Sequence, residues 1–410
     1  MKRLAPTLIA LLFAAGAAAQ SNPETTTVPS SLGPLRVTTV ASGLQNPWGL
    51  AFLPDGRALV TERPGRLRMI ANGVLSPALA GVPAVWAQGQ GGLLDVAVDP
   101  DFQTNQRIYL TFSEVGGDGR AGTAVARARL VGQGLQDVAV IFRQDPKLST
   151  GNHFGSRLVF DRQGHLFVTL GENNVRITAQ YLDHHQGKVV RLWPDGRIPA
   201  DNPFVARTDA LIDIWSYGHR NPQGATLNPW TGQLWLVEHG AMGGDEVNIP
   251  AAGKNYGWPI ITHGLDYNGQ PIPESVGSSA PGMEQPVHYW VPSIAPSGMA
   301  FYQGFSMHRW QGDLFVGALA SRQLVRLDIN GDRVVGEERL LGSLGHRIRD
   351  VRSGPNGELY LLTDATNGRV LKVELAKRGW YRELHSEKPR TGAAAAPGRM
   401  PRPEARPVQQ

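Results

Sequence analysis

Six residues that can move a proton or bind an anion lie in loops directly before apolar, strand-like segments. They are Gln90, His153, Arg220, Asn221, Arg347 and Arg349. Arginines grouped around one pocket suit a ligand with planar carboxylates, because one guanidinium can donate two parallel hydrogen bonds to a carboxylate. A histidine beside them suits a general base, and neighbouring cations would keep its imidazole neutral. If these loops converge, the sequence predicts proton abstraction beside a bound polyanion.

Each of these residues also has a purely structural explanation when it is taken alone. His153 could be a turn or core histidine, and Arg220 could form a salt bridge inside the fold. Arg347 and Arg349 could flank a strand on its polar face. Their equivalent positions, each before a similar strand, favour a shared site. We expect the two glycines that flank His153 to leave room there for a ligand.

A second unusual segment, EHGAMGGDEVNIPAAGKNYGWP, spans residues 238–259. Asp245 and Glu246 follow two glycines, and the chain has no cysteine, so a metal would need oxygen or imidazole ligands. Carboxylates and backbone carbonyls in a glycine-rich loop are typical of calcium sites. A solvated turn remains the alternative for this acidic pair.

The elements that must position these residues form a repeat. One pattern, apolar alternation, a polar turn and a second apolar run, recurs at residues 48–63, 93–114, 156–172, 224–240, 297–319 and 349–364. Each copy is typical of a β-hairpin, and a further strand follows most copies. Glycine (49) and proline (30) are both frequent among the 410 residues, which favours many short strands. The repeat predicts an all-β fold, a six-bladed β-propeller of four-stranded antiparallel blades, over a pair of β-sandwiches.

The two ends of the chain differ from this body. Residues 1–19 combine Lys2 and Arg3 with a short apolar stretch and small residues, which indicates a secretory signal peptide. We expect an N-terminal extension at 20–34, the propeller at 35–376 and a disordered Pro/Ala-rich tail at 377–410. The tail holds eight Lys/Arg and three Asp/Glu, a net charge of +5, so the body is close to neutral. The sequence therefore predicts a periplasmic protein without a membrane span or a nucleic-acid partner.

Six motifs taken together resemble one protein family. They are GQGGLLDVAVDPDF, NHFGSRLVFDRQGHLFVTLGE, GHRNPQG, EHGAMGGDEVN, KNYGWP and RIRDV. In this order they resemble the soluble quinoprotein glucose/aldose sugar dehydrogenases, and most closely the bacterial periplasmic aldose sugar dehydrogenases. The resemblance covers about residues 35–375 and implies a six-bladed propeller that uses pyrroloquinoline quinone (PQQ) and calcium. It also implies oxidation of an aldose at the anomeric carbon to a lactone, with an external electron acceptor and a monomer or homodimer.

The resemblance assigns catalytic roles through the matching motifs. His153 matches the base that takes the proton of the anomeric hydroxyl, after which hydride passes to C5 of the quinone. Arg220 matches the arginine that stabilises charge on the quinone oxygens, and Asn221 matches its cofactor-binding neighbour. Gln90 matches a glutamine of the reaction centre.

The resemblance also assigns binding roles. Arg347 and Arg349 match arginines that bind carboxylates of PQQ, and Tyr267 matches a residue of the cofactor pocket. Backbone carbonyls of Gly240 and Ala241 match ligands of the calcium that PQQ holds.

One matched pair and one departure complete the comparison with the family pattern. Glu246 and Tyr256 match calcium ligands of the aldose branch. The glucose branch has a lysine that pairs with the cofactor where this chain has Ala320. We expect the insertion at 265–292 to shape substrate choice, with Tyr289 and Trp290 either stacking on a sugar or packing on a blade.

Two other functions fit a propeller with these loops. A calcium-dependent sugar lactonase would use metal-activated water and would not need an arginine cluster. A non-catalytic binding propeller would not need His153. The arginines and the histidine together favour the dehydrogenase.

Overall fold

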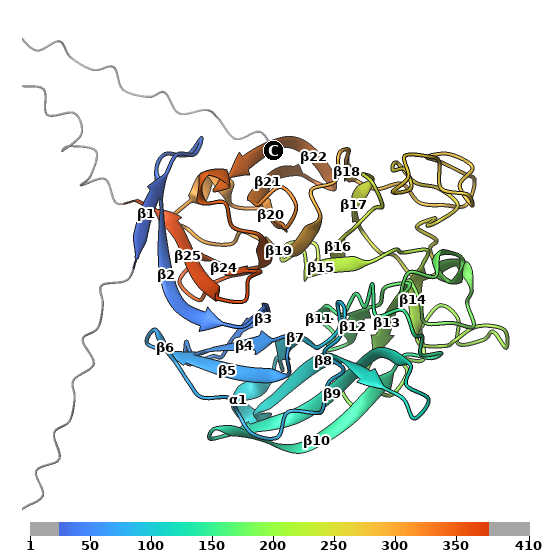
Figure 1. Ribbon diagram of the computed structural model, residues 1–410, viewed down its shortest axis with the longest axis horizontal. Coiled ribbons are helices and arrows are strands. Elements are labelled where there is room, and N and C mark those ends of the chain that lie inside the picture. Colours follow the sequence, from blue (N-terminus) through green and yellow to red (C-terminus); the bar gives the residue numbers. More distant parts are fainter. Residues whose placement is uncertain (1–23, 377–410) are drawn as a thin grey trace, which may run out of the picture. The chain divides into compact units, whose positions relative to one another are not determined.

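The computed structural model describes residues 24–376, and these form six antiparallel sheets around a central axis (Figure 1). The predicted signal peptide and the predicted tail from residue 377 lie outside the described residues. Five of the sheets have four strands and one has five, so the predicted six-bladed propeller is confirmed, with one strand added to the last blade.

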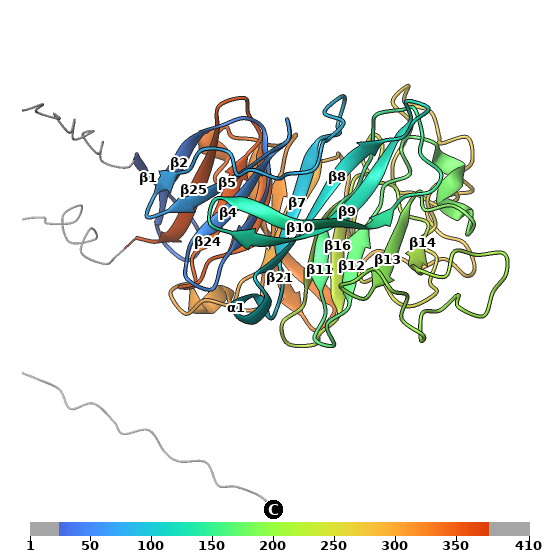
Figure 2. The same ribbon diagram turned by 90° about the horizontal axis from the view of Figure 1, so that it is seen from below.

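The first three blades follow one another along the chain. Blade one contains β3 (Pro47–Phe52), β4 (Ala58–Glu62), β5 (Arg66–Ala71) and β6 (Val74–Leu75). Blade two contains β7 (Leu93–Val98), β8 (Arg107–Val115), β9 (Ala121–Val131) and β10 (Gly134–Arg143). Blade three contains β11 (Leu158–Phe160), β12 (Leu166–Thr169), β13 (Lys188–Leu192) and β14 (Ile214–Tyr217). Figure 2 shows the sheet of β11–β14 beside that of β7–β10.

The other blades repeat this order. Blade four contains β15 (Pro222–Leu227), β16 (Leu234–Glu238), β17 (Asp245–Asn248) and β18 (His288–Trp290). Blade five contains β19 (Pro296–Phe301), β20 (Leu314–Ala318), β21 (Gln323–Asn330) and β22 (Arg333–Leu340). Blade six contains β23 (Ile348–Ser353), β24 (Leu359–Thr363) and β25 (Gly368–Leu375), followed by β2 (Leu35–Leu44) and β1 (Thr25–Val28). Four short helical segments are α1 (Phe102–Asn105) and the 3₁₀ turns η1 (Arg176–Gln180), η2 (His308–Trp310) and η3 (Gly342–Leu344).

The ring closes through strands from opposite ends of the described chain. β2 pairs antiparallel with β25, with Leu35 opposite Leu375 and Val37 opposite Val373. The innermost strands β3, β7, β11, β15, β19 and β23 contact one another in turn, and β23 contacts β3. β2 therefore covers the outer edge of β25, and backbone pairing between the two ends of the described chain completes the last blade.

Hydrophobic clusters fill the interfaces between neighbouring blades. Leu59 of blade one packs with Leu110 of blade two, and Phe167 of blade three packs with Leu236 of blade four. The second strand of each hairpin is buried on both faces, because a blade lies on either side of it. This is why the second run of each sequence copy is apolar on both faces.

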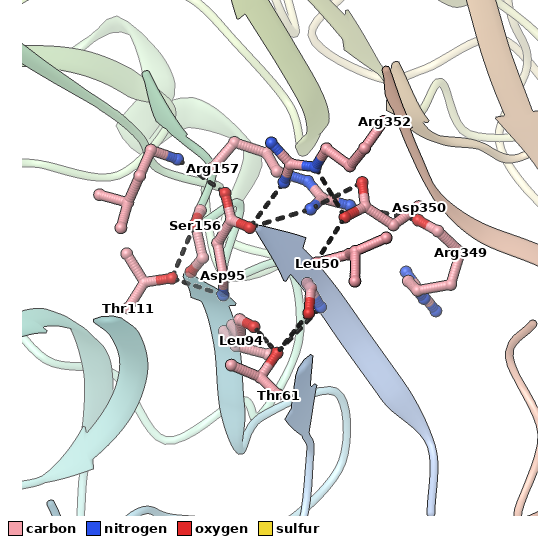
Figure 3. A network of polar contacts seen from close by, with 12 residues as sticks. Leu50, Thr61, Leu94, Asp95, Thr111, Ser156, Arg157, Arg349, Asp350 and Arg352 are labelled. Carbon is pink, nitrogen blue, oxygen red and sulfur yellow. Dashed lines mark hydrogen bonds and ion pairs between the residues drawn. The ribbon is translucent and has the colours of Figure 1, made fainter. Parts of the chain in front are cut away.

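A charged network joins the innermost strands near the axis (Figure 3). The Arg157 guanidinium lies 3.2 Å from an Asp95 carboxylate oxygen and 3.1 Å from one of Asp350. Arg352 binds Asp95 at 2.8 Å, and the Leu50 amide donates to Asp350 at 3.0 Å. Two cations balance two buried carboxylates, so removal of one partner would leave an unpaired buried charge. The network ties blades one, two, three and six together.

Candidate functional site

A cavity of about 230 Å³ lies beside this network, and all six blades contribute to its lining. The lining residues are Trp48, Arg63, Gln90, Leu94, Phe154, Gly155, Asn221, Gln223, His239, Ala295, Leu319, Arg347, Arg349 and Asp364. Nearly all of them lie near the start of the innermost (first) strand of a blade or just after the second strand. These two positions form the open end of the inner hairpin of each blade. The predicted residues Gln90, Asn221, Arg347 and Arg349 therefore meet in one place, as the loop positions indicated.

His153 borders the cavity between Gln90 and a buried carboxylate. Its backbone amide donates to the Gln90 side-chain oxygen at 2.9 Å, and its neighbours Phe154 and Gly155 line the cavity. Its Nδ1 lies 2.6 Å from Glu172 Oε2. A buried carboxylate at this distance fixes the proton on Nδ1, so Nε2 is the nitrogen with a free lone pair.

The glycines around His153 lie in close contact with other parts of the protein. A Cβ on Gly155 would lie 2.7 Å from the Gly171 amide nitrogen, and one on Gly151 would lie 2.9 Å from the Trp86 ring. Both glycines also have positive φ. Close approach by the protein's own atoms therefore requires glycine at both positions, and Gly155 also lines the cavity.

Glu172, which the sequence motifs did not single out, belongs to a feature that recurs in the fold. In an antiparallel hairpin the end of the second strand lies beside the start of the first. Glu62 accepts from the Gln45 amide, Glu238 from the Arg220 amide, and Asp364 from Arg347 and Arg349. An acidic residue at the end of a second strand, or within three residues after it, is the signal that would have predicted Glu172 and Asp364.

Arg220 is buried but has no carboxylate partner for its side chain among residues 24–376. Its guanidinium makes only long contacts of 3.4 Å, with the His239 carbonyl and the Tyr267 hydroxyl, and its Nε has no hydrogen-bond partner in this range. The Trp258 ring lies 5.2 Å from Cζ. A buried guanidinium with unused donors is suited to stabilise negative charge on a ligand.

Arg347 and Arg349 share Asp364, with three contacts of 3.2–3.3 Å to one carboxylate oxygen. Arg349 also donates to Gln223 at 2.8 Å, and its Nε finds no partner in the part of the chain that is described. Burial lowers the pKa of Arg349, and Asp364 opposes this shift. Two guanidinium groups sharing one carboxylate leave donors free for a further anion.

His239 also lines the cavity, although the sequence alone assigned no role to this residue of the EHGAMGGDEVN motif. Its Nε2 lies 2.6 Å from the Pro296 carbonyl, so Nε2 carries the proton. Burial, with a smaller contribution from Arg220, lowers the pKa of His239 to about 3. The imidazole is therefore neutral over the working range of an enzyme.

The two residues that follow His239 present backbone oxygens. Among residues 24–376, no hydrogen bond ends on the Gly240 carbonyl, Ala241 forms an isolated β-bridge with Gly243, and the Gly240 amide donates to Asp245 at 2.9 Å. Asp245 is fully buried and is also bound by Ser293 and two backbone amides. It is a structural clamp on this loop and not a solvated turn residue.

Glu246 and Tyr256 do not line the cavity. Burial, together with the nearby Glu238, raises the pKa of Glu246 to about 8, and Asn248 donates to both carboxylates. The Tyr256 hydroxyl donates to the Ile249 carbonyl at 2.6 Å. The described residues contain no group of three or more His, Asp or Glu side chains that could hold a metal. A calcium site here would therefore combine carbonyl oxygens with at most two acidic side chains.

The insertion before blade five gives two different outcomes for its aromatic residues. Trp290 is buried between blades four and five and donates to Glu337 at 2.9 Å, so the packing alternative is the correct one. Tyr289 is half exposed and stacks on His263 with ring centroids 3.9 Å apart. Tyr267 is 69% exposed. Ala320 is not among the lining residues, whereas the preceding Leu319 is.

The fold and this cavity define a class: a six-bladed propeller with a cationic pocket beside a carboxylate-oriented imidazole. The chain belongs to the Glucose / Sorbosone dehydrogenase family, whose model matches residues 44–372. This confirms the resemblance drawn from the motifs and the expected class of enzyme, an oxidoreductase of the aldose sugar dehydrogenase type.

Three relatives illustrate the similarity. The chain is 55% identical over 343 residues to aldose sugar dehydrogenase YliI of Escherichia coli, covering 83% of this chain and 92% of that protein. The apo form of the soluble E. coli aldose sugar dehydrogenase superposes with a TM-score of 0.82 over 83% of this chain and 100% of that one, at 54% identity. The PQQ-bound form of aldose sugar dehydrogenase from Streptomyces coelicolor gives a TM-score of 0.68 over 86% and 99%, at 26% identity.

Proposed function

We propose that this protein oxidises aldose sugars at the anomeric carbon to lactones, with PQQ and calcium as cofactors. One observation carries the proposal: a cavity lined by three arginines and one acidic residue borders a histidine whose Nδ1 is fixed by a buried carboxylate. When bound, PQQ supplies the two-electron acceptor for the anomeric hydride, and calcium supplies a Lewis acid beside it.

The residues present fit such a cofactor. The Nε atoms of Arg63, Arg220 and Arg349 are buried and have no hydrogen-bond partner among residues 24–376. Buried guanidinium donors are normally satisfied, so the unsatisfied donors of Arg63 and Arg349 in the cavity lining, with that of Arg220 outside it, support a polyanionic ligand. Arg347 and Arg349 would bind carboxylates of PQQ, and the backbone carbonyls of Gly240 and Ala241 would bind calcium.

His153 would act as the base. Its Nε2 takes the proton of the anomeric hydroxyl, and Glu172 stabilises the positive charge that the imidazole then carries. Arg220, without a carboxylate of its own, would stabilise negative charge that develops on the acceptor. Asn221 and Gln90 would hold the reacting groups in place, as expected from the family pattern, since both line the cavity.

Further expectations accompany this function. Glu246 and Tyr256 would bind calcium away from the cavity, through a carboxylate oxygen and a free backbone carbonyl, since the phenol is already bonded. Tyr267 would close the outer side of the pocket. We expect export to the periplasm and reoxidation by an external electron acceptor. In residues 24–376 no helix has the length and apolarity needed to cross a membrane.

Reconstitution tests the proposal. The purified apoprotein is incubated with PQQ and calcium, and reduction of an artificial electron acceptor by a panel of aldoses is measured. The expected result is dye reduction that requires both cofactors and produces the corresponding lactone. His153→Ala should retain PQQ binding and lose turnover. Hydrolysis of sugar lactones without PQQ would favour the lactonase, and absence of any PQQ-dependent spectral change would reject the dehydrogenase.

A further inference from the structure

Arg63 is the cavity-lining cation that no motif assigned. It follows the last residue of β4 and lies in blade one, next to the blade that supplies Arg347 and Arg349. Arg63 and Arg349 line the same cavity, and after burial the Arg63 charge adds a small contribution to the lowered pKa of Arg349. With Arg347 and Asp364 they give the lining three cations and one anion.

The other arginines of this hairpin all have carboxylate partners. Arg57 binds Asp55 at 2.7 Å, Arg66 binds Glu62 at 2.7 Å and Arg68 binds Glu62 at 3.3 Å. Arg63 forms no ion pair within the described part of the chain. Its Nε is buried and unpartnered, which is costly for a charged donor unless a ligand completes it.

Arg63 also braces the loop that leads to the base. Its Nη2 donates to the Gly89 carbonyl at 3.0 Å, and its own carbonyl accepts from the Leu93 amide at 3.0 Å. Between these two contacts lies Gln90, whose side-chain oxygen accepts from the His153 amide. The side chain is thus held in place with Nε free, because one terminal nitrogen is already committed to the backbone.

We propose that Arg63 binds a carboxylate of the cofactor, as a third anion-binding arginine contributed by blade one. The inference rests on the proposed function, since it names PQQ as the ligand. In this chain the loop at 319–322 contributes only Leu319 to the lining, and the carbonyl of that residue accepts from Arg347. The cations of the cavity come from blade six and blade one.

This assignment is tested by measuring the binding of PQQ to the apoprotein in the presence of calcium. Quenching of tryptophan fluorescence reports the binding. Arg63→Gln should raise the Kd by about ten- to a hundredfold, because one charge-assisted contact is lost. Arg63→Lys, which keeps the charge, should stay closer to the wild type. Arg57→Gln, an exposed ion-paired arginine of the same sheet, is the matched control and should leave the Kd unchanged.

Arginine modification of the unaltered protein gives a second measurement that does not depend on folding of a variant. Phenylglyoxal labelling is mapped by mass spectrometry with and without PQQ. Bound PQQ should protect Arg63 and should not protect Arg57. An unchanged Kd for a folded Arg63→Gln protein, or equal labelling of Arg63 with and without PQQ, overturns this inference alone. Failure of the wild-type protein to bind PQQ overturns the proposed function together with it.

Discussion

Glu172 can act on His153 in two ways: it orients the imidazole, and its charge stabilises the imidazolium. Replacement of Glu172 by glutamine separates these two effects. Glu172 is fully buried, lies 2.6 Å from His153 Nδ1, and accepts from the Asn174 amide at 3.1 Å on the same oxygen. Glutamine keeps the size and can still accept from Nδ1–H, but it removes the negative charge that stabilises the imidazolium. A hydrogen bond to a charged group contributes about 1.5–3 kcal/mol. At 1.36 kcal/mol per factor of ten, kcat should fall by roughly ten- to 150-fold.

The assay measures steady-state kinetics of the protein reconstituted with PQQ and calcium, at saturating electron acceptor. The loss should appear in kcat, while the Kd for PQQ measured by fluorescence changes less than threefold, since Glu172 does not line the cavity. Glu172→Asp, which is shorter by one methylene, should lower kcat because the carboxylate no longer reaches Nδ1.

Glu284→Gln provides the control, because Glu284 is an exposed carboxylate paired with Lys254 and its loss should leave kcat unchanged. A Glu172→Gln protein with kcat within threefold of the wild type would refute the role given to the His153–Glu172 pair. An equal loss of PQQ affinity and kcat would instead show that Glu172 maintains the cavity as a whole.

Three other outcomes are expected. Leu35→Ala, in the strand that closes the ring, should lower the free energy of unfolding by about 2–5 kcal/mol in denaturant titrations, because Leu35 is fully buried; an unchanged midpoint would contradict the closure. The pKa of His239 is lowered in the fold, so stability should fall as the pH drops below 6.5 towards 3; His239→Gln should show a smaller loss in thermal melts over this range, and an identical profile would contradict the cause. Calcium at a hundred times its Kd should stabilise the apoprotein by about 2.7 kcal/mol, and Glu246→Gln should reduce the shift in Tm because it removes a proposed carboxylate ligand; an equal shift would contradict that role.

The number and type of blades were predictable because the sequence of each inner hairpin has the same local pattern of apolar residues. Apolar residues alternate in the first strand and are continuous in the second, where a blade packs on each face. The closure through β2 and β1 was not predictable in this way. It joins Leu35 to Leu375, and no local pattern encodes a pairing across the whole described chain.

The site residues also fall into a group that the sequence predicted and a group that it did not. Gln90, Asn221, Arg347 and Arg349 were found because they precede first strands, and first strands surround one axis. Glu172, His239 and Asp364 were missed because they follow second strands, whose ends looked like ordinary turns. Antiparallel pairing returns those ends to the same opening, so residues at both ends of every inner hairpin should be considered together.

The segment that pairs with β2 to close the ring also supplies residues of the pocket, so the ring and the pocket are completed together. Arg347, Arg349 and Asp364 all lie in the last segment of the described chain, which also provides the partner for β2. A nascent polypeptide that ends before this segment has an open circle of five blades and lacks two of the guanidinium groups that face the cavity. Premature termination products would thus lack a complete pocket, and only molecules that contain this last segment could hold the proposed ligand.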